Sequence, residues 1–149
     1  MRVNALFMAL TEARIRSIVS SIEKSSDVII RTTLAGGPHE ALGNLLNRSD
    51  VVFVNRGQKE SKLIRLLESL RQCRADIPIV LVYACEPDGK AYLLANRFDC
   101  WLFSEKDRLQ RTLTSGEIGE ALADRTQDAA VEQRLFEVAS CAGPCSTGT

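Results

Sequence analysis

The residues that directly follow apolar, strand-like segments are the ones whose types and spacing could support chemistry. Asn55 is the most informative of them, because it ends the apolar run Val51–Val54 and opens a polar loop. In a parallel sheet, side chains at the carboxyl ends of the strands line the active crevice. An amide is not a nucleophilic carboxylate, and it brings no negative charge to hold a divalent metal ion. Asn55 therefore predicts a crevice without covalent or metal chemistry at this strand.

Three other strand-like segments end on residues that are equally unreactive. These residues are Leu10 and Thr11, Tyr83, and Ser104. Together with Asn55 they supply neither a paired acid and base nor a nucleophile with its base, and an enzyme's active site needs one or the other. We therefore expect no enzymatic activity, no metal ion and no cofactor at this crevice.

Alternating strands and helices must position these residues. Apolar runs predict strands at Val3–Leu10, Val28–Leu34, Val51–Val54, Ile79–Val82 and Cys100–Phe103. Helical periodicity predicts a first helix whose apolar face holds Ile15, Ile18, Val19 and Ile22. Four further helices are predicted at His39–Leu46, Ser61–Cys73, Lys90–Asn96 and from about Gly116 onward. Alternation of this kind indicates an α/β fold with helices on both faces of a parallel sheet. The expected architecture is a doubly wound five-stranded parallel sheet in the flavodoxin-like order 2-1-3-4-5.

From Asn55 through the apolar helix to Arg71, the chain resembles a response-regulator receiver domain of the CheY-like kind. The resemblance covers roughly residues 3–122 at the level of strand and helix spacing. It implies an acidic metal-binding pair, an aspartate that accepts a phosphoryl group, a small hydroxyl residue and a lysine. At those positions this chain has Leu10 and Thr11, Asn55, Tyr83 and Ser104. The resemblance therefore implies a pseudo-receiver, whose phosphorylation chemistry has been removed.

Two charged residues lie close to the degenerate positions. Glu12 follows Thr11 directly, but it reaches a metal site only with a shifted loop, because one residue along the chain re-aims the side chain. Lys106 lies two residues after Ser104, in an enlarged loop, and is the alternative source of a positive charge.

The resemblance also implies a protein-binding face made by the fourth helix, the fifth strand and the fifth helix, where receivers commonly dimerise or bind partners. Tyr92, Arg97 and Trp101 are expected to share this face, and aromatic and arginine residues dominate binding hot spots. Trp101 is the single tryptophan, and it is either a core indole or an anchor for a partner. The expected partner is another protein or a second copy of the chain.

Composition argues against several function classes. The chain carries 19 Lys and Arg against 19 Asp and Glu residues, so bulk charge gives no case for binding nucleic acid. No apolar run approaches the roughly 20 residues that a membrane span needs. The five cysteines are odd in number and irregularly spaced, which argues against a secreted disulfide framework. Reduced thiols in a cytoplasm are the simpler interpretation.

Weaker motifs suggest no further site. His39 is the single histidine, and with no other ligands near it we interpret it as a surface or helix-capping residue. Gly36 and Gly37 lack the rest of a phosphate-binding fingerprint. Cys141 and Cys145 have a three-residue spacer rather than the two residues of a redox or zinc motif.

We divide the chain into a receiver-like domain over residues 1–122 and a helical extension with a flexible tail over residues 123–149. Pilus-assembly localisation proteins of the TadZ/CpaE kind carry atypical receivers before an ATPase domain, and this chain resembles them at the level of the degenerate site. No Walker motif is present, so such an ATPase part would lie outside this chain. Two alternatives stay open: a small-ligand-binding domain on the same fold, and a thiol-based redox sensor. The sensor would use Cys85 and Cys100, or the pair Cys141 and Cys145.

Overall fold

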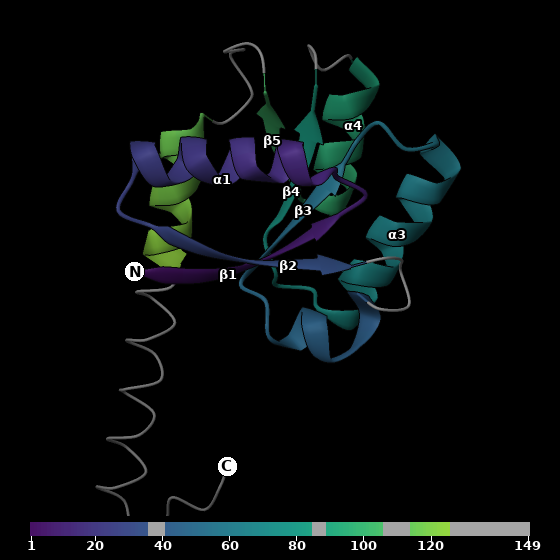
Figure 1. Ribbon diagram of the computed structural model, residues 1–149. Helices are drawn as coiled ribbons and strands as arrows, with labels where there is room; N and C mark the ends of the chain where they lie inside the picture. Colours follow the sequence, from purple (N-terminus) through teal and green to yellow (C-terminus); the bar gives the residue numbers. More distant parts are fainter. Residues whose placement is uncertain (36–40, 85–88, 106–113, 126–149) are drawn as a thin grey trace, which may run out of the picture.

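The computed structural model describes residues 1–35, 41–84, 89–105 and 114–125, which form alternating strands and helices (Figure 1). In chain order the elements are β1 (Arg2–Met8), α1 (Glu12–Ser25), β2 (Ile29–Ala35), η1 (Ala41–Leu45), β3 (Val51–Asn55), α3 (Glu60–Cys73), β4 (Ile79–Tyr83), α4 (Gly89–Phe98) and β5 (Trp101–Ser104). Residues 115–125 are the last described helix, and we call them helix 115–125. No helix in these ranges combines the length and the apolarity that crossing a membrane requires.

The five strands form one parallel sheet in the order β2-β1-β3-β4-β5. This order confirms the doubly wound topology predicted from the sequence. All residues of β4 and four of the five residues of β3 are buried, which suits central strands that are covered on both faces. Because all strands run the same way, their carboxyl ends meet at one edge of the sheet, and this edge holds Asn55, Tyr83 and Ser104.

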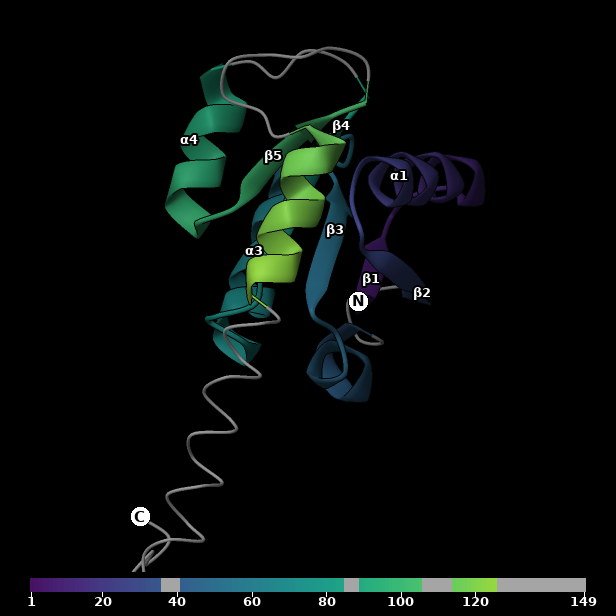
Figure 2. The same ribbon diagram turned by 90° about the vertical axis from the view of Figure 1, so that its left-hand side faces the viewer.

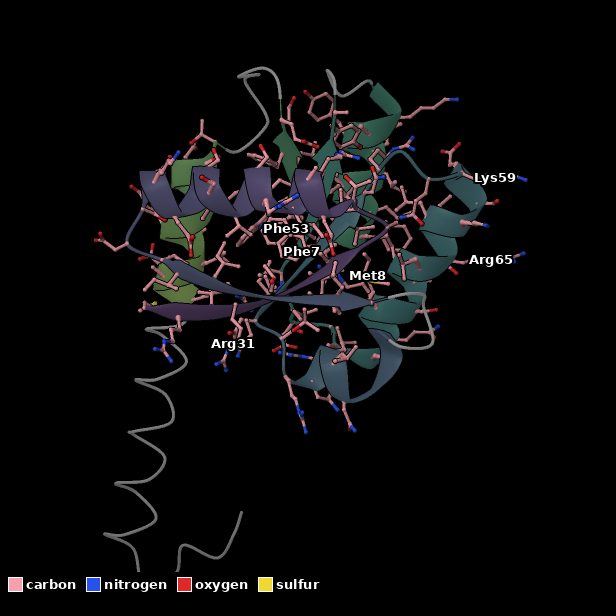
Figure 3. The ribbon with its side chains drawn as sticks, viewed as in Figure 1. Phe7, Met8, Arg31, Phe53, Lys59 and Arg65 are labelled. Atoms are coloured by element: carbon pink, nitrogen blue, oxygen red, sulfur yellow. The ribbon has the colours of Figure 1, made fainter. Side chains whose placement is uncertain are left out.

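The sheet separates two apolar clusters. Leu67 of α3 is fully buried in the first cluster, whereas Ile18 of α1 and Ile118 of helix 115–125 are buried in the second. Figure 2 shows α3 and α4 on one side of the strands and α1 on the other. Phe7 of β1 and Phe53 of β3 stack within the second cluster, with ring centroids 4.8 Å apart (Figure 3). The helices thus occupy both faces, as the alternating pattern predicts.

Two threonines begin the helices of the second cluster. The Thr11 side chain accepts a hydrogen bond from the Arg14 main chain at the start of α1. At the start of helix 115–125, Thr114 Oγ1 accepts from the Glu117 main chain, and the Glu117 carboxylate accepts from the Thr114 main chain. This reciprocal pair is a capping box, which satisfies two main-chain donors at the helix start.

The two helices also touch along their length. Ser21 of α1 and Ser115 are hydrogen-bonded through their hydroxyls at 2.6 Å. Gly119 lies against Ser26, the residue that caps the end of α1. These contacts set the position of helix 115–125 relative to α1.

Several predicted element boundaries were wrong. β1 ends at Met8 rather than Leu10, because Ala9 adopts a left-handed conformation with φ of 59° and turns the chain out of the sheet. β2 and β5 each lie one residue later than predicted, and α4 extends to both sides of its predicted range. The predicted helix His39–Leu46 is described only from residue 41, where it is a π-helix. His39 and the Gly36–Pro38 turn lie outside the described residues.

Candidate functional site

Asn55 is bonded through both ends of its side-chain amide. Its Nδ2 donates to the Ala9 main-chain oxygen at 2.9 Å, and its Oδ1 accepts from the Gly57 main-chain nitrogen at 2.8 Å. The second bond closes an Asx turn, in which a side-chain oxygen accepts from the main chain two residues on. A Cβ on Gly57 would lie 3.1 Å from Asn55 Oδ1, so the turn favours glycine there. The amide therefore joins the end of β3 to the β1–α1 loop.

The residues at the predicted metal position have structural roles. Thr11 caps α1, as described above, and Leu10 is half-buried and packs against the second apolar cluster. Glu12 is exposed in the first turn of α1, where a carboxylate favours the helix dipole. Within the described ranges, no three His, Cys, Asp or Glu side chains gather closely enough to hold a metal ion.

The two remaining predicted positions lie side by side. Tyr83 and Ser104 are the last residues of β4 and β5, and they are register partners in the sheet. Tyr83 is 7% exposed and packs in the first apolar cluster with the side chains of α3 and α4. The sheet thus brings Asn55, Tyr83 and Ser104 to one edge, and Lys106 lies outside the described residues.

An ion pair that the sequence did not predict joins α1 to the end of β5 at this edge. Arg14 donates from Nε to Glu105 Oε1 at 2.8 Å, and its Nη2 also bonds to the same oxygen. Arg14 lies in the first turn of α1 and Glu105 directly follows β5, so 91 residues separate the partners. No local pattern signals a pair so distant in sequence. Glu105 also donates its main-chain N–H to the Tyr83 oxygen at 2.9 Å.

A groove of about 450 Å³ lies between α4, β5 and helix 115–125. Tyr92 and Trp101, both half-buried, line this groove with Ala95, Asn96, Cys100, Leu102 and Ala121. Trp101 also packs against the second apolar cluster, so it is partly core and partly wall of the groove. We call this surface the α4–β5 groove. It brings together two of the three residues predicted for a partner-binding face.

The third predicted residue, Arg97, is directed elsewhere. Its Nη2 lies 3.4 Å from the Glu68 carboxylate on α3, and its guanidinium stacks 4.9 Å above the Phe98 ring. Arg97 does not line the α4–β5 groove. Its predicted role in partner binding stays a prediction.

Charges of opposite sign lie on the two helices beside the groove. α4 carries Lys90 and Arg97 and no acidic residue, whereas helix 115–125 exposes Glu117, Glu120 and Asp124.

The described cysteines differ in their fitness for thiol chemistry. Burial raises the pKa of the Cys100 thiol from its ordinary 9.0 to about 12, although Arg71 lowers it in part. Cys100 is therefore a protonated thiol near neutral pH, which makes it a poor nucleophile. Cys73 is exposed at the end of α3, and Cys85, Cys141 and Cys145 lie outside the described residues. The geometry argues against Cys100 as a redox sensor.

Solved structures with the same fold are receiver domains and related proteins. A candidate pilus assembly-related protein from Burkholderia pseudomallei superposes with a TM-score of 0.61 at 14% identity, over 82% of this chain and 87% of that one. A CheY-like protein (tadZ) from Pseudomonas aeruginosa gives 0.57 at 16% identity, over 82% and 98%. The isolated REC domain of RcsB from Salmonella enterica gives 0.60 at 12% identity, over 85% and 90%.

These similarities show that the chain has the CheY-like receiver fold, in agreement with the resemblance noted in the sequence. No family model matches the chain, and no curated protein matches it significantly. Identities this low establish the fold and leave function to the site itself.

Proposed function

We propose that this domain is a receiver-like signalling module that is not phosphorylated and that acts by binding protein. One observation carries the proposal: the Asn55 amide donates a hydrogen bond to the Ala9 carbonyl. An ionised aspartate can only accept hydrogen bonds, so it could not make this bond. The residue that replaces the phosphoacceptor is thus part of the fold's own hydrogen bonding, and Thr11 is likewise occupied as a helix cap.

The α4–β5 groove is the proposed binding surface. Tyr92 and Trp101 present aromatic side chains at its walls, and such side chains supply much of the energy of protein interfaces. A second copy of the chain is the favoured partner. A two-fold axis would bring the aromatic side chains of one groove against those of the other, because the same surface then meets itself.

The first experiment measures solution mass by light scattering together with Trp101 fluorescence, with and without magnesium and beryllofluoride, which mimics a phosphorylated aspartate. Neither signal is expected to respond in the wild-type chain. Trp101 is the single tryptophan, so its emission reports directly on the groove. A response at stoichiometric beryllofluoride would overturn the proposal, because some carboxylate would then be completing the site.

The same instrument tests the groove. If the wild type associates, its mass rises with concentration, and Trp101→Ala shifts that rise to higher concentration. Arg65→Ala changes an exposed residue of α3 that does not line the groove, and it serves as the control (Figure 3). A Trp101→Ala mass curve identical to wild type would contradict the proposed surface.

A second candidate function is an atypical receiver module of a larger pilus-assembly or localisation protein of the TadZ/CpaE kind. It is favoured by the superposition on the pilus assembly-related protein and on the tadZ protein. The matched region covers 87% of the first of those chains and 98% of the second. Deletion of the gene in its own organism tests it. Loss of surface pili, restored by wild type but not by Trp101→Ala, supports this role, and unchanged pili argue against it.

A further inference from the structure

Hydrogen bonds between neighbouring segments form a closed belt around the carboxyl edge of the sheet. Asn55 Nδ2 donates to the Ala9 oxygen (2.9 Å), and the Arg56 main-chain nitrogen donates to the Val82 oxygen (3.0 Å). The Glu105 main-chain nitrogen donates to the Tyr83 oxygen (2.9 Å). The Arg14 side chain donates to the Glu105 carboxylate, and the Arg14 main-chain nitrogen donates to Thr11 Oγ1 (3.3 Å). Thr11 returns to Ala9 through Leu10. The belt therefore ties together the ends of β3, β4 and β5 and the start of α1.

The Arg14–Glu105 ion pair is the charged link of this belt. The Arg14 and Glu105 side chains are 25% and 19% exposed, so solvent screens the pair less than it screens an open surface pair. Two guanidinium nitrogens converge on one carboxylate oxygen. Charge-assisted hydrogen bonds of this kind are stronger than neutral ones, so this link contributes more than the others.

The ion pair acts at the end of the strand that holds Trp101. Glu105 follows Ser104, the last residue of β5, and Trp101 is the first residue of that strand. Trp101 shares the second apolar cluster with Ile15 and Ile18 of α1, so the pair and the cluster hold β5 against the same helix. A shift of the β5 end relative to α1 would therefore move the wall of the α4–β5 groove.

We propose that the Arg14–Glu105 ion pair is a positioning contact that fixes β5 and thereby holds the α4–β5 groove in one conformation. Main-chain and side-chain groups together hold this end of the sheet, and the ion pair is the charged contact among them. The inference rests on the proposed function only where it treats the groove as a binding surface.

The test uses Arg14→Gln and Glu105→Gln, which remove one charge each and keep similar size. Trp101 emission is expected to shift in both variants. Amide exchange of Glu105, whose N–H bonds to Tyr83, should be about tenfold faster, as expected for the loss of one charge-assisted hydrogen bond. The double variant Arg14→Glu with Glu105→Arg should return both readouts toward wild type.

A matched control is the exposed ion pair between Arg97 and Glu68, whose side chains are 59% and 47% exposed. Glu68→Gln removes one charge of this exposed pair from α3, which does not line the groove, and neither readout is expected to move. If folded Glu105→Gln shows unchanged Trp101 emission and unchanged exchange of the residue 105 main-chain N–H, the inference is overturned. If Arg14→Gln fails to fold, the test uses Glu105→Gln and the charge-swapped double variant. A double variant in which neither Trp101 emission nor the amide exchange returns toward wild type also overturns the inference.

The two proposals fail in different ways. If Trp101 responds to Glu105→Gln while the concentration dependence of the mass stays that of wild type, the positioning role stands and the groove is not the binding surface. If Trp101→Ala weakens association but Glu105→Gln changes neither emission nor exchange, the surface stands and the positioning role is wrong.

Discussion

Gly119 lies so close to Ser26 that a Cβ at position 119 would stand 2.1 Å from Ser26 Oγ and 2.5 Å from Ser26 Cβ. Glycine at this position is therefore what lets helix 115–125 meet the end of α1. Ser26 in turn donates its hydroxyl hydrogen to the Ile22 carbonyl at 2.7 Å, so its side chain is held in place.

Gly119→Ala is expected to lower the free energy of unfolding by about 1–3 kcal/mol, the usual cost of overpacking a well-packed contact. Urea titration followed by circular dichroism measures it. Ser26→Gly in the same chain removes both clashing atoms and should recover most of the loss. Gly43→Ala is the control, because an added Cβ there meets nothing within 4 Å. A Gly119→Ala protein as stable as wild type would show that the contact is not tight.

Asn55→Asp is expected to destabilise the domain by about 0.5–1.5 kcal/mol at neutral pH, because a carboxylate replaces the donor that faces the Ala9 carbonyl. The bond from Gly57 survives, since either side chain offers an oxygen. A protonated carboxyl group can donate again, so the folded state raises the pKa of the new aspartate. The deficit relative to wild type should therefore be full above that pKa and shrink as the pH falls. Paired urea titrations across this range check the prediction, and a deficit that grows in acid contradicts it.

Arg71→Lys is expected to lower the free energy of unfolding by about 1.5–3 kcal/mol, because the lysine ammonium cannot reproduce the planar set of donors of a guanidinium. The Arg71 guanidinium donates to the main-chain oxygens of Phe98 (2.7 Å), Ile77 (2.6 Å), Asp99 (2.8 Å) and Ala75 (3.3 Å). It thus joins the end of α3 to the turn between α4 and β5. Arg65→Lys, on the exposed surface of α3, is the control for thermal unfolding. Equal melting temperatures for the two variants would rule out this role.

Cys100 is expected to resist alkylation at neutral pH, because burial raises its pKa to about 12. Iodoacetamide with peptide mapping should label exposed Cys73 well before Cys100 in the folded chain. The raised pKa of Cys100 also makes the stability of the folded chain depend on pH. The folded state holds the Cys100 proton more tightly than the unfolded chain does, so this contribution is present below pH 9 and is lost as the pH rises toward 12. Rapid labelling of Cys100 before unfolding would contradict the buried environment.

The strands and the helix faces could be predicted because they follow from short apolar runs, and the alternation of strands and helices then indicated the strand order. Val51–Val54 reads as a buried strand, and Ile15, Ile18 and Ile22 repeat at helical spacing, so both signals lie within a few residues. The Asx turn of Asn55 is equally local, since its partner is Gly57.

What the sequence did not reveal depends on contacts between distant segments. Arg14 and Glu105 look like ordinary surface charges, and only the folded sheet brings the start of α1 to the end of β5. The ion pair between Arg97 of α4 and Glu68 of α3 likewise joins two separate helices, so no local pattern predicts it. The early end of β1 depends on the left-handed conformation of Ala9, which an alanine does not signal.

The hydrogen bond between Ser21 and Ser115 joins residues 94 positions apart, and it has a consequence for how the chain folds during synthesis. The ribosome produces α1 early, whereas Ile118 and Leu122, which complete its apolar cluster, are made last among the described residues. Contacts at such separation form slowly, because the chain between them must first be ordered. Part of the apolar surface of α1 therefore stays open to solvent and to chaperones until helix 115–125 has left the ribosome.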